Sequence, residues 1–134
     1  MKQYIGTKII HAEPMEKNGR YGYKVVYAPD GYESWSPKDV FEAAYRLTDG
    51  MNFGLAIEAA KMGMKIARKG WNGKNQHVEL GINFAYYSVA GICSETHHKD
   101  IGSAALVFVG TRGRQVGWLA SQADMLADDW YIVE

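Results

Sequence analysis

With 134 residues, the chain is long enough for one globular domain, or for a small domain that carries an added module of about fifty residues. Apolar residues make up 47% and charged residues 22% of the sequence, a composition that excludes an intrinsically disordered chain. The 15 basic and 15 acidic residues cancel, which argues against a protein that coats long nucleic acid by neutralising phosphates, while leaving room for a local basic pocket.

The first 47 residues predict a small module made of a β-hairpin and a helix. β-Branched and aromatic side chains, which are typical of strands, are concentrated at 7–12, 21–27 and 32–35. The sequence PDG at 29–31 predicts the turn of the hairpin.

The helix of this module has a predicted start. The Ser36 hydroxyl can cap free backbone N–H groups, and Pro37 suits the first helical position, where no N–H is needed. We expect the helix to run to about Arg46. Its apolar side chains recur at helical spacing and would cover one face of the hairpin; they are Val40, Phe41, Ala44 and Tyr45.

A second unit is predicted from residue 51 to 134, after a linker at 47–50. An alanine-rich helix opens at 51–54 and ends at Gly63. Apolar runs separated by glycines then predict an antiparallel sheet. Its expected strands lie at 65–68, 77–80, 84–92, 104–109, 116–119 and 130–133, and the basic turn at 111–114 is expected to be a hairpin tip.

Near the end of the chain, Ser121 and Asp124 have the spacing of a capping box and predict a short helix through Leu126. The predicted fold class is therefore α+β. It comprises an antiparallel sheet with a long helix and a short C-terminal helix, preceded by the small β-hairpin and helix module of residues 1–47.

The segment 66–74 is the first candidate binding site. It places Arg68, Lys69 and Trp71 beside two glycines at a transition from strand to loop. Such a loop can stack a base or ribose on the indole while its cations and backbone N–H groups approach phosphate. A turn with a half-buried tryptophan and solvated lysines is the alternative interpretation.

The segment 118–130 is the second candidate. It combines two tryptophans, Trp118 and Trp130, with a helix N-terminus whose free N–H groups could bind an anion. Alternatively, Ser121 and Asp124 only cap the helix while the tryptophans fill the core. Asp124 could serve both as a cap and as an acceptor for a ribose hydroxyl.

The remaining polar residues give little support for an enzyme. His97 and His98 are adjacent, so their imidazoles would converge on one metal only from a loop, and a solvated loop is the simpler interpretation. The motifs G-x-S-x-G, H-E-x-x-H and G-x-x-x-x-G-K-[ST] are absent from the sequence. We expect no catalytic residue, no metal and no cofactor.

Two features bear on the compartment. The single cysteine, Cys93, can form neither an intramolecular disulfide nor a multi-cysteine zinc site, which suits a reducing cytoplasm. No apolar run approaches the ~20 residues that span a bilayer, and no hydrophobic signal core follows the first residues. We expect a protein without a membrane partner.

Residues 51–134 resemble a phage domain family that includes the second type of Thoeris anti-defence sponge. The resemblance rests on FGLAIEA at 53–59, ARKGWNG at 67–73 and, above all, WLASQADMLADDW at 118–130. Two features depart from the family pattern: Gly117 stands where members commonly carry proline, and residues 95–115 match no family motif.

The resemblance implies a compact protomer that assembles as a homotetramer and encloses cyclic nucleotide signals at subunit interfaces, in the cytoplasm of the host bacterium. The implied signals are glycocyclic ADP-ribose isomers of Thoeris immunity and, for some members, cyclic oligonucleotides of CBASS immunity. Members bind these signals without cleaving them, so the resemblance implies a sponge and not an enzyme.

The resemblance also implies a set of ligand-binding residues. They are Phe53, Arg68, Lys69, Trp71, Asn72, Trp118, Ser121, Gln122 and Asp124. Within this set, Trp71 and Trp118 would stack on adenine and the two cations would pair with pyrophosphate. The polar side chains, namely Asn72, Ser121 and Asp124, would contact ribose hydroxyls.

Residues 1–47, with their motifs at 4–8 and 30–37, resemble an accessory segment of other small phage proteins. We expect this module to pack on the sponge domain or to mediate assembly, because so small a module buries too little apolar surface to be very stable alone.

Two other functions compete with the sponge. A cyclic nucleotide phosphodiesterase would need a role for Glu95, His97, His98 or Asp100, and a structural phage protein would need no small-molecule ligand. The sponge is favoured because capture needs stacking and phosphate contacts but no general base or activated nucleophile.

Overall fold

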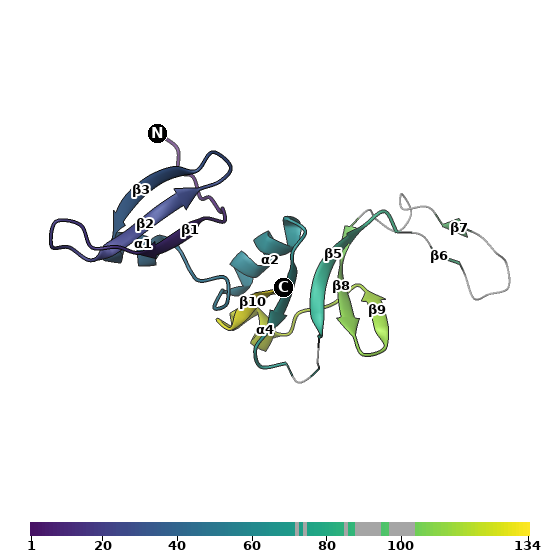
Figure 1. Cartoon of the computed structure of the whole chain (residues 1–134). Coiled ribbons are helices and arrows are strands. Elements are labelled where there is room, and N and C mark those ends of the chain that lie inside the picture. The colour runs from purple at the N-terminus through teal and green to yellow at the C-terminus, as the bar shows by residue number, and fades with distance from the viewer. Residues whose placement is uncertain (72, 74, 85, 88–94, 97–103) are drawn as a thin grey trace. The chain divides into compact units, whose positions relative to one another are not determined.

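The computed structural model describes residues 1–71, 73, 75–84, 86, 87, 95, 96 and 104–134. The chain divides into two compact units, Met1–Leu47 and Thr48–Glu134, each with its own sheet (Figure 1). Every strand pair in the described residues is antiparallel, and helices accompany both main sheets, so the α+β prediction is confirmed. Within the described ranges, no helix has the length and apolar character that crossing a membrane requires.

The first unit is a three-stranded sheet with one short helix (Figure 1). Strand β2 (Gly22–Tyr27) lies between β1 (His11–Pro14) and β3 (Tyr32–Pro37), and helix α1 follows at Lys38–Ala44. The helix attaches to the sheet through stacked aromatic rings rather than through a buried core.

The centre of the Phe41 ring lies 4.1 Å from that of Tyr23 on β2 and 5.0 Å from that of Tyr45. The Tyr23 hydroxyl also donates a hydrogen bond of 2.8 Å to the Glu42 carboxylate. Val40 is 58% exposed and Ala44 is exposed as well, so the prediction that all four apolar residues of the helix cover the sheet is wrong for these two.

The first strand of this unit differs from the prediction. It begins at His11 rather than at residue 7, and it pairs with β2, so the unit is a three-stranded meander. Asn18 and Gly19, with φ of 52° and 78°, form the turn, as a two-residue hairpin turn with positive φ at both positions requires. The Asn-Gly pair is a sequence signal for this turn that the prediction did not use.

The helix start also differs. Strand β3 continues through Pro37, which is itself the N-cap and makes no side-chain capping hydrogen bond. Ser36 is paired with Tyr23 in the sheet, so its backbone is committed to the strand and its hydroxyl does not cap the helix. The helix ends at Ala44, before the expected Arg46.

The second unit is built on a five-stranded sheet in the order β10-β4-β5-β8-β9 (Figure 1). Its strands are β4 (Lys65–Arg68), β5 (His77–Ile82), β8 (Ala104–Gly110), β9 (Gly113–Val116) and β10 (Trp130–Val133). The predictions for 65–68, 77–80, 104–109 and 130–133 are confirmed, and 111–114 forms the tip of the β8-β9 hairpin.

The predicted strand at 116–119 is wrong. Strand β9 ends at Val116, because Gly117 adopts φ of 93°, which is incompatible with an extended strand. The predicted strand at 84–92 lies largely outside the described residues. Of that region the structure describes β6 (Tyr86–Tyr87) paired with β7 (Glu95–Thr96).

Helix α2 (Phe53–Lys61) packs on the five-stranded sheet through its alanines. The Asn52 side chain caps it by accepting a hydrogen bond of 2.9 Å from the Leu55 N–H. Ala56, Ala59 and Ala60 are buried, and these short side chains allow the helix backbone to approach the sheet. Gly63, with φ of 91°, ends the helix as predicted.

The close contact between Gly22 and Trp35 leads to the first prediction. A β-carbon at Gly22 would lie 2.5 Å from the Trp35 ring and closer still to the Ser36 carbonyl oxygen. We expect Gly22→Ala to destabilise the first unit by about 2 kcal/mol, because neither the backbone nor the packed ring can move away cheaply. Hydrogen exchange should show loss of protection in β2 and unchanged protection in β4 and β5.

Gly6→Ala is the matched control, since a β-carbon at Gly6 would meet no atom within 4 Å. Equal loss of protection in both units, or no loss in β2, would contradict the prediction.

Candidate functional site

Five aromatic rings gather at one end of the second unit. The Trp130 ring is fully buried, and its centre lies 5.4 Å from those of Phe53 and Trp71 and 6.1 Å from that of Trp118. Trp71 also meets Trp118 at 6.0 Å and Phe108 at 5.7 Å, both edge to face. Trp71 and Trp118 are only half-buried, so they belong to the edge of the core and to the surface at once.

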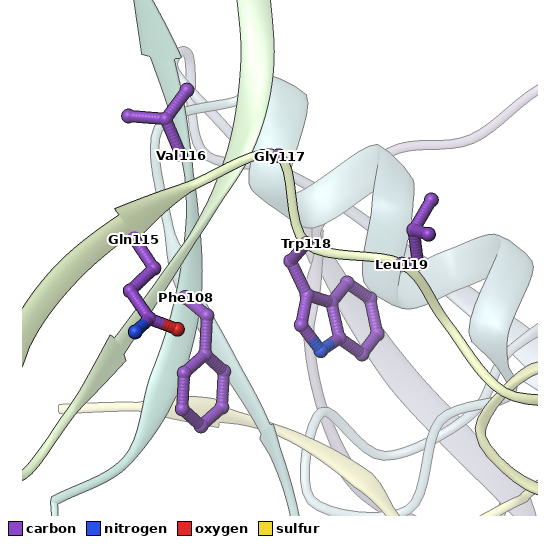
Figure 2. A pocket seen from close by; sticks show the side chains of 6 residues that line it. All are labelled: Phe108, Gln115, Val116, Gly117, Trp118 and Leu119. Carbon is purple, nitrogen blue, oxygen red and sulfur yellow. The ribbon is translucent and has the colours of Figure 1, made fainter.

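An open pocket of about 340 Å³ borders this cluster (Figure 2). Its lining residues are Phe108, Gln115, Val116, Gly117, Trp118 and Leu119. Figure 2 shows the rings of Phe108 and Trp118 projecting to one side of the chain, whereas Val116 and Leu119 project to the other. The pocket therefore has an aromatic wall and an exposed aliphatic rim.

Gly117 sets the direction of Trp118. Its φ of 93° turns the chain out of β9, and the N–H groups of Gly117 and Trp118 both donate hydrogen bonds of 2.9 Å to the Leu106 carbonyl. Proline could neither adopt this φ nor donate this hydrogen bond. The proline expected here from the sequence resemblance would thus be incompatible with the conformation of this chain.

Beside the cluster, Arg68 binds two carboxylates. Its Nε donates to Asp129 at 2.8 Å and its Nη1 donates to Asp124 at 3.0 Å. Arg68 ends β4, whereas Asp124 lies in α4 (Gln122–Leu126) and Asp129 directly precedes β10. The guanidinium therefore ties α4 and the residue before β10 to the end of β4.

Asp124 has two structural roles. It completes the predicted capping box, because its carboxylate accepts from the Ser121 N–H at 3.0 Å and its own N–H donates to the Ser121 hydroxyl at 3.0 Å. Its backbone carbonyl accepts the Trp130 indole N–H at 2.8 Å. Burial raises the pKa of the Asp124 carboxyl. The hydrogen bonds from Ser121 and Arg68 lower this pKa, and their combined effect exceeds that of burial, so the net pKa lies below its usual range.

Asp129 holds the start of the loop that carries Trp71. Its carboxylate accepts from the Gly70 N–H at 3.3 Å, and its backbone carbonyl accepts from the Lys69 N–H at 3.2 Å. The hydrogen bond from Arg68 holds the pKa of the Asp129 carboxyl below its usual range, against the opposing effect of burial. The sequence motif contains Asp128 and Asp129 side by side, but only tertiary contacts distinguish them.

The structure brings most of the predicted binding residues into two adjoining groups. Phe53, Trp71 and Trp118 belong to the aromatic cluster, and Arg68, Ser121 and Asp124 belong to the hydrogen-bond network. Both groups meet at Trp130.

Three predicted binding residues stand apart from these groups. Lys69 and Gln122 have exposed side chains, and Asn72 lies outside the described residues. The residues missed by sequence reasoning are Phe108, Gln115 and Asp129. Strand register could have indicated the first two, since Phe108 faces Gln115 across β8 and β9.

His97, His98 and Asp100 also lie outside the described residues. Within the described ranges, no group of three or more histidine, cysteine or acidic side chains is placed to hold a metal ion.

The double ion pair of Arg68 leads to a prediction about pH. Both aspartates have folded pKa values below the unfolded value of about 3.9, so the unfolded state takes up protons first as the pH falls. Their contribution to stability is full above that value and is lost as the pH falls through the folded pKa values. Arg68→Met should cost on the order of 2 kcal/mol at neutral pH, and it should flatten the loss of stability below about pH 5.

Urea unfolding at a series of pH values measures both effects. Asp128→Asn is the matched control, because Asp128 is exposed and adjacent to Asp129, and it should change stability by less than about 0.5 kcal/mol. An unchanged dependence on pH in the Arg68→Met variant would show that the network is not linked to acid stability.

Comparison with known proteins identifies the family of the second unit. The family model described as the Thoeris anti-defense 2-like domain matches residues 51–133, which include all three sequence motifs and the whole aromatic cluster. The chain is also similar to the protein named Thoeris anti-defense 2 from Bacillus phage SP01, with 37% identity over 84 residues, covering 62% of this chain and 94% of the relative. The chain therefore belongs to the Thoeris anti-defense 2-like family of phage anti-defence proteins, as the resemblance of residues 51–134 predicted.

Proposed function

We propose that this phage anti-defence protein is a sponge that acts in the host bacterial cytoplasm. It would bind and sequester cyclic nucleotide immune signals, either glycocyclic ADP-ribose of Thoeris immunity or cyclic oligonucleotides of CBASS immunity, and release them intact. The observation that carries this proposal is the pair of half-buried indoles, Trp71 and Trp118, beside an open pocket.

The aromatic wall suits a nucleobase. Each indole is fixed by edge-to-face contacts with Trp130, so a stacking surface exists before a ligand arrives and little side-chain entropy is lost on binding. Stacking of a base on an aromatic side chain contributes about 1–3 kcal/mol. The pocket is therefore suited to the flat part of a nucleotide.

The same pocket supports capture without cleavage. None of its six lining residues carries a titratable side chain, so none can serve as a general acid or base. Arg68 is also restrained, because its charge is shared between two carboxylates. It retains N–H donors for a phosphate oxygen, since these two hydrogen bonds use two of the five N–H groups of a guanidinium.

The negative charge of a pyrophosphate needs a further cation. Arg68, Asp124 and Asp129 together carry a net charge of −1, so this network alone repels phosphate. The exposed Lys69, next to Arg68, is one source of positive charge. A second copy of the chain is another.

A second copy would also close the pocket. At about 340 Å³, the pocket lies near the lower end of the range for small-molecule sites and is open to solvent. Leu119 on its rim is 90% exposed, Val116 is 60% exposed, and Leu126 on α4 is 78% exposed. We therefore propose that this surface is covered by another protomer in a homotetramer, with the ligand enclosed between subunits.

Calorimetric titration tests the sponge. The purified protein should bind a glycocyclic ADP-ribose isomer or a cyclic oligonucleotide, and the ligand recovered after heat denaturation should have its original mass. Trp118→Ala should weaken binding about ten- to hundredfold through lost stacking, and Trp118→Phe should retain part of the affinity.

Tyr21→Ala is the matched aromatic control, because Tyr21 is 75% exposed on the first unit. Recovery of a cleaved product, with activity abolished by replacement of His97 and His98 with alanine, would favour the phosphodiesterase. No binding of any of these signals would favour a structural phage protein.

Light scattering tests the assembly. Leu119→Asp should convert the tetramer to smaller species and weaken ligand binding together, because a charge at this position would be buried in the proposed interface. A tetramer that survives Leu119→Asp would place the interface elsewhere.

A further inference from the structure

The tip of the β1-β2 hairpin in the first unit carries a second candidate site, independent of the proposed function. The family match begins at residue 51, so this hairpin lies outside it. The site consists of Trp35 on β3 and the two cations Lys17 and Arg20 that flank the Asn18-Gly19 turn.

Trp35 is held in a fixed position. Its indole N–H donates a hydrogen bond of 2.9 Å to the Met15 carbonyl, and its ring lies on Gly22, where a β-carbon would come within 2.5 Å of it. The ring is half-buried and thus presents part of its surface to solvent. The sheet provides a rigid aromatic platform beside the hairpin tip.

The two cations are directed to this platform by the turn. Lys17 and Arg20 are paired across the hairpin by reciprocal backbone hydrogen bonds of 2.9 and 3.0 Å. The Lys17 ammonium and the Arg20 guanidinium both lie over the Trp35 ring, each 5.8 Å from its centre. Like charges placed directly opposite each other in a hairpin are destabilising, although attraction to the ring offsets part of this repulsion.

Carboxylates do not balance this pair of charges. Within the described residues, neither cation lies within 4 Å of a carboxylate, whereas the neighbouring Lys24 lies 3.5 Å from Glu33 and 3.9 Å from Glu13. Lys24 is paired with Trp35 in the sheet, so neutralised and unneutralised cations stand side by side. The hairpin tip is therefore a local concentration of positive charge in a chain without net charge.

We propose that Lys17, Arg20 and Trp35 bind a phosphate group that belongs to a nucleotide or to a nucleic-acid strand. A guanidinium can hold two phosphate oxygens at once, and an ammonium adds a compact charge beside it. The indole below would contact the sugar or base attached to that phosphate. An anion between the two cations also removes the repulsion that the hairpin otherwise carries.

The indole N–H resonance of Trp35 gives a site-specific test in the full-length protein. At about 0.01 M ionic strength, where screening is weak, titration with pyrophosphate, AMP and a short single-stranded oligonucleotide should shift this resonance and saturate. The double variant Lys17→Gln, Arg20→Gln should weaken binding at this site at least about tenfold, as expected for the loss of two charged contacts.

The matched control removes the same charge elsewhere in the first unit. Lys2→Gln, Lys38→Gln should leave the titration of Trp35 unchanged, because both side chains are exposed and neither lies over an indole within the described residues. A stronger effect of AMP than of pyrophosphate would identify a nucleotide site, and a stronger effect of the oligonucleotide would identify a nucleic-acid strand.

Two results would overturn the proposal: a Trp35 resonance that none of the three probes moves, or an equal response in both double variants. Neither result bears on the sponge, whose ligand is detected through binding at the second unit and through its dependence on Trp118.

Discussion

The buried indole of Trp130 joins the elements of the second unit to one another. Its N–H donates to the carbonyl of Asp124, while its backbone exchanges two hydrogen bonds, of 2.8 and 3.1 Å, with Met51. Its ring contacts Phe53 on α2 and Trp71 in the loop after β4. Removal of this side chain would separate the helix, the sheet edge and the loop that carries Trp71 at once, and a Trp-to-Ala change in such a position costs about 3–5 kcal/mol.

The contacts of the Trp130 ring with Trp71 and Trp118 explain why the candidate site is partly core and partly surface. Trp71 and Trp118 each pack edge to face on the buried ring and are only half-buried; Trp118 lines the pocket, and Trp71 packs against the pocket residues Phe108 and Trp118. A rigid interior thus fixes the two surfaces that would receive a ligand. Sequence reasoning presented core packing and ligand stacking as alternatives for these tryptophans, and the geometry is compatible with both.

Arg68 is a predicted phosphate-binding residue that has a structural role as well. Its place in a basic segment at a transition from strand to loop suggests a phosphate ligand, but its guanidinium joins Asp124 and Asp129. A proposal of pyrophosphate binding therefore needs Lys69 or a second protomer as well. The open pocket and its exposed Leu119 are consistent with the proposed neighbouring subunit.

The first unit has its own sheet and its own aromatic contacts, so its stability and its binding properties can be studied through residues that the second unit does not share. The close packing of Trp35 on Gly22, the hydrogen bond from its indole to Met15 and the Asn18-Gly19 turn define the conformation of its hairpin tip. Two like charges that face each other without a carboxylate are locally unfavourable. Such a locally unfavourable arrangement is expected at a binding site.

The sequence alone determined those features that depend on near neighbours in the chain. The capping box of Ser121 and Asp124, the end of α2 at Gly63 and the strand at 65–68 follow from local hydrogen bonding and backbone preference. Only the tertiary structure decided that Arg68 pairs with Asp124 and Asp129, that Phe108 joins the tryptophans, and that Ser36 stays in a strand. These outcomes depend on contacts between residues distant in the sequence, where strand register and side-chain packing override local preference.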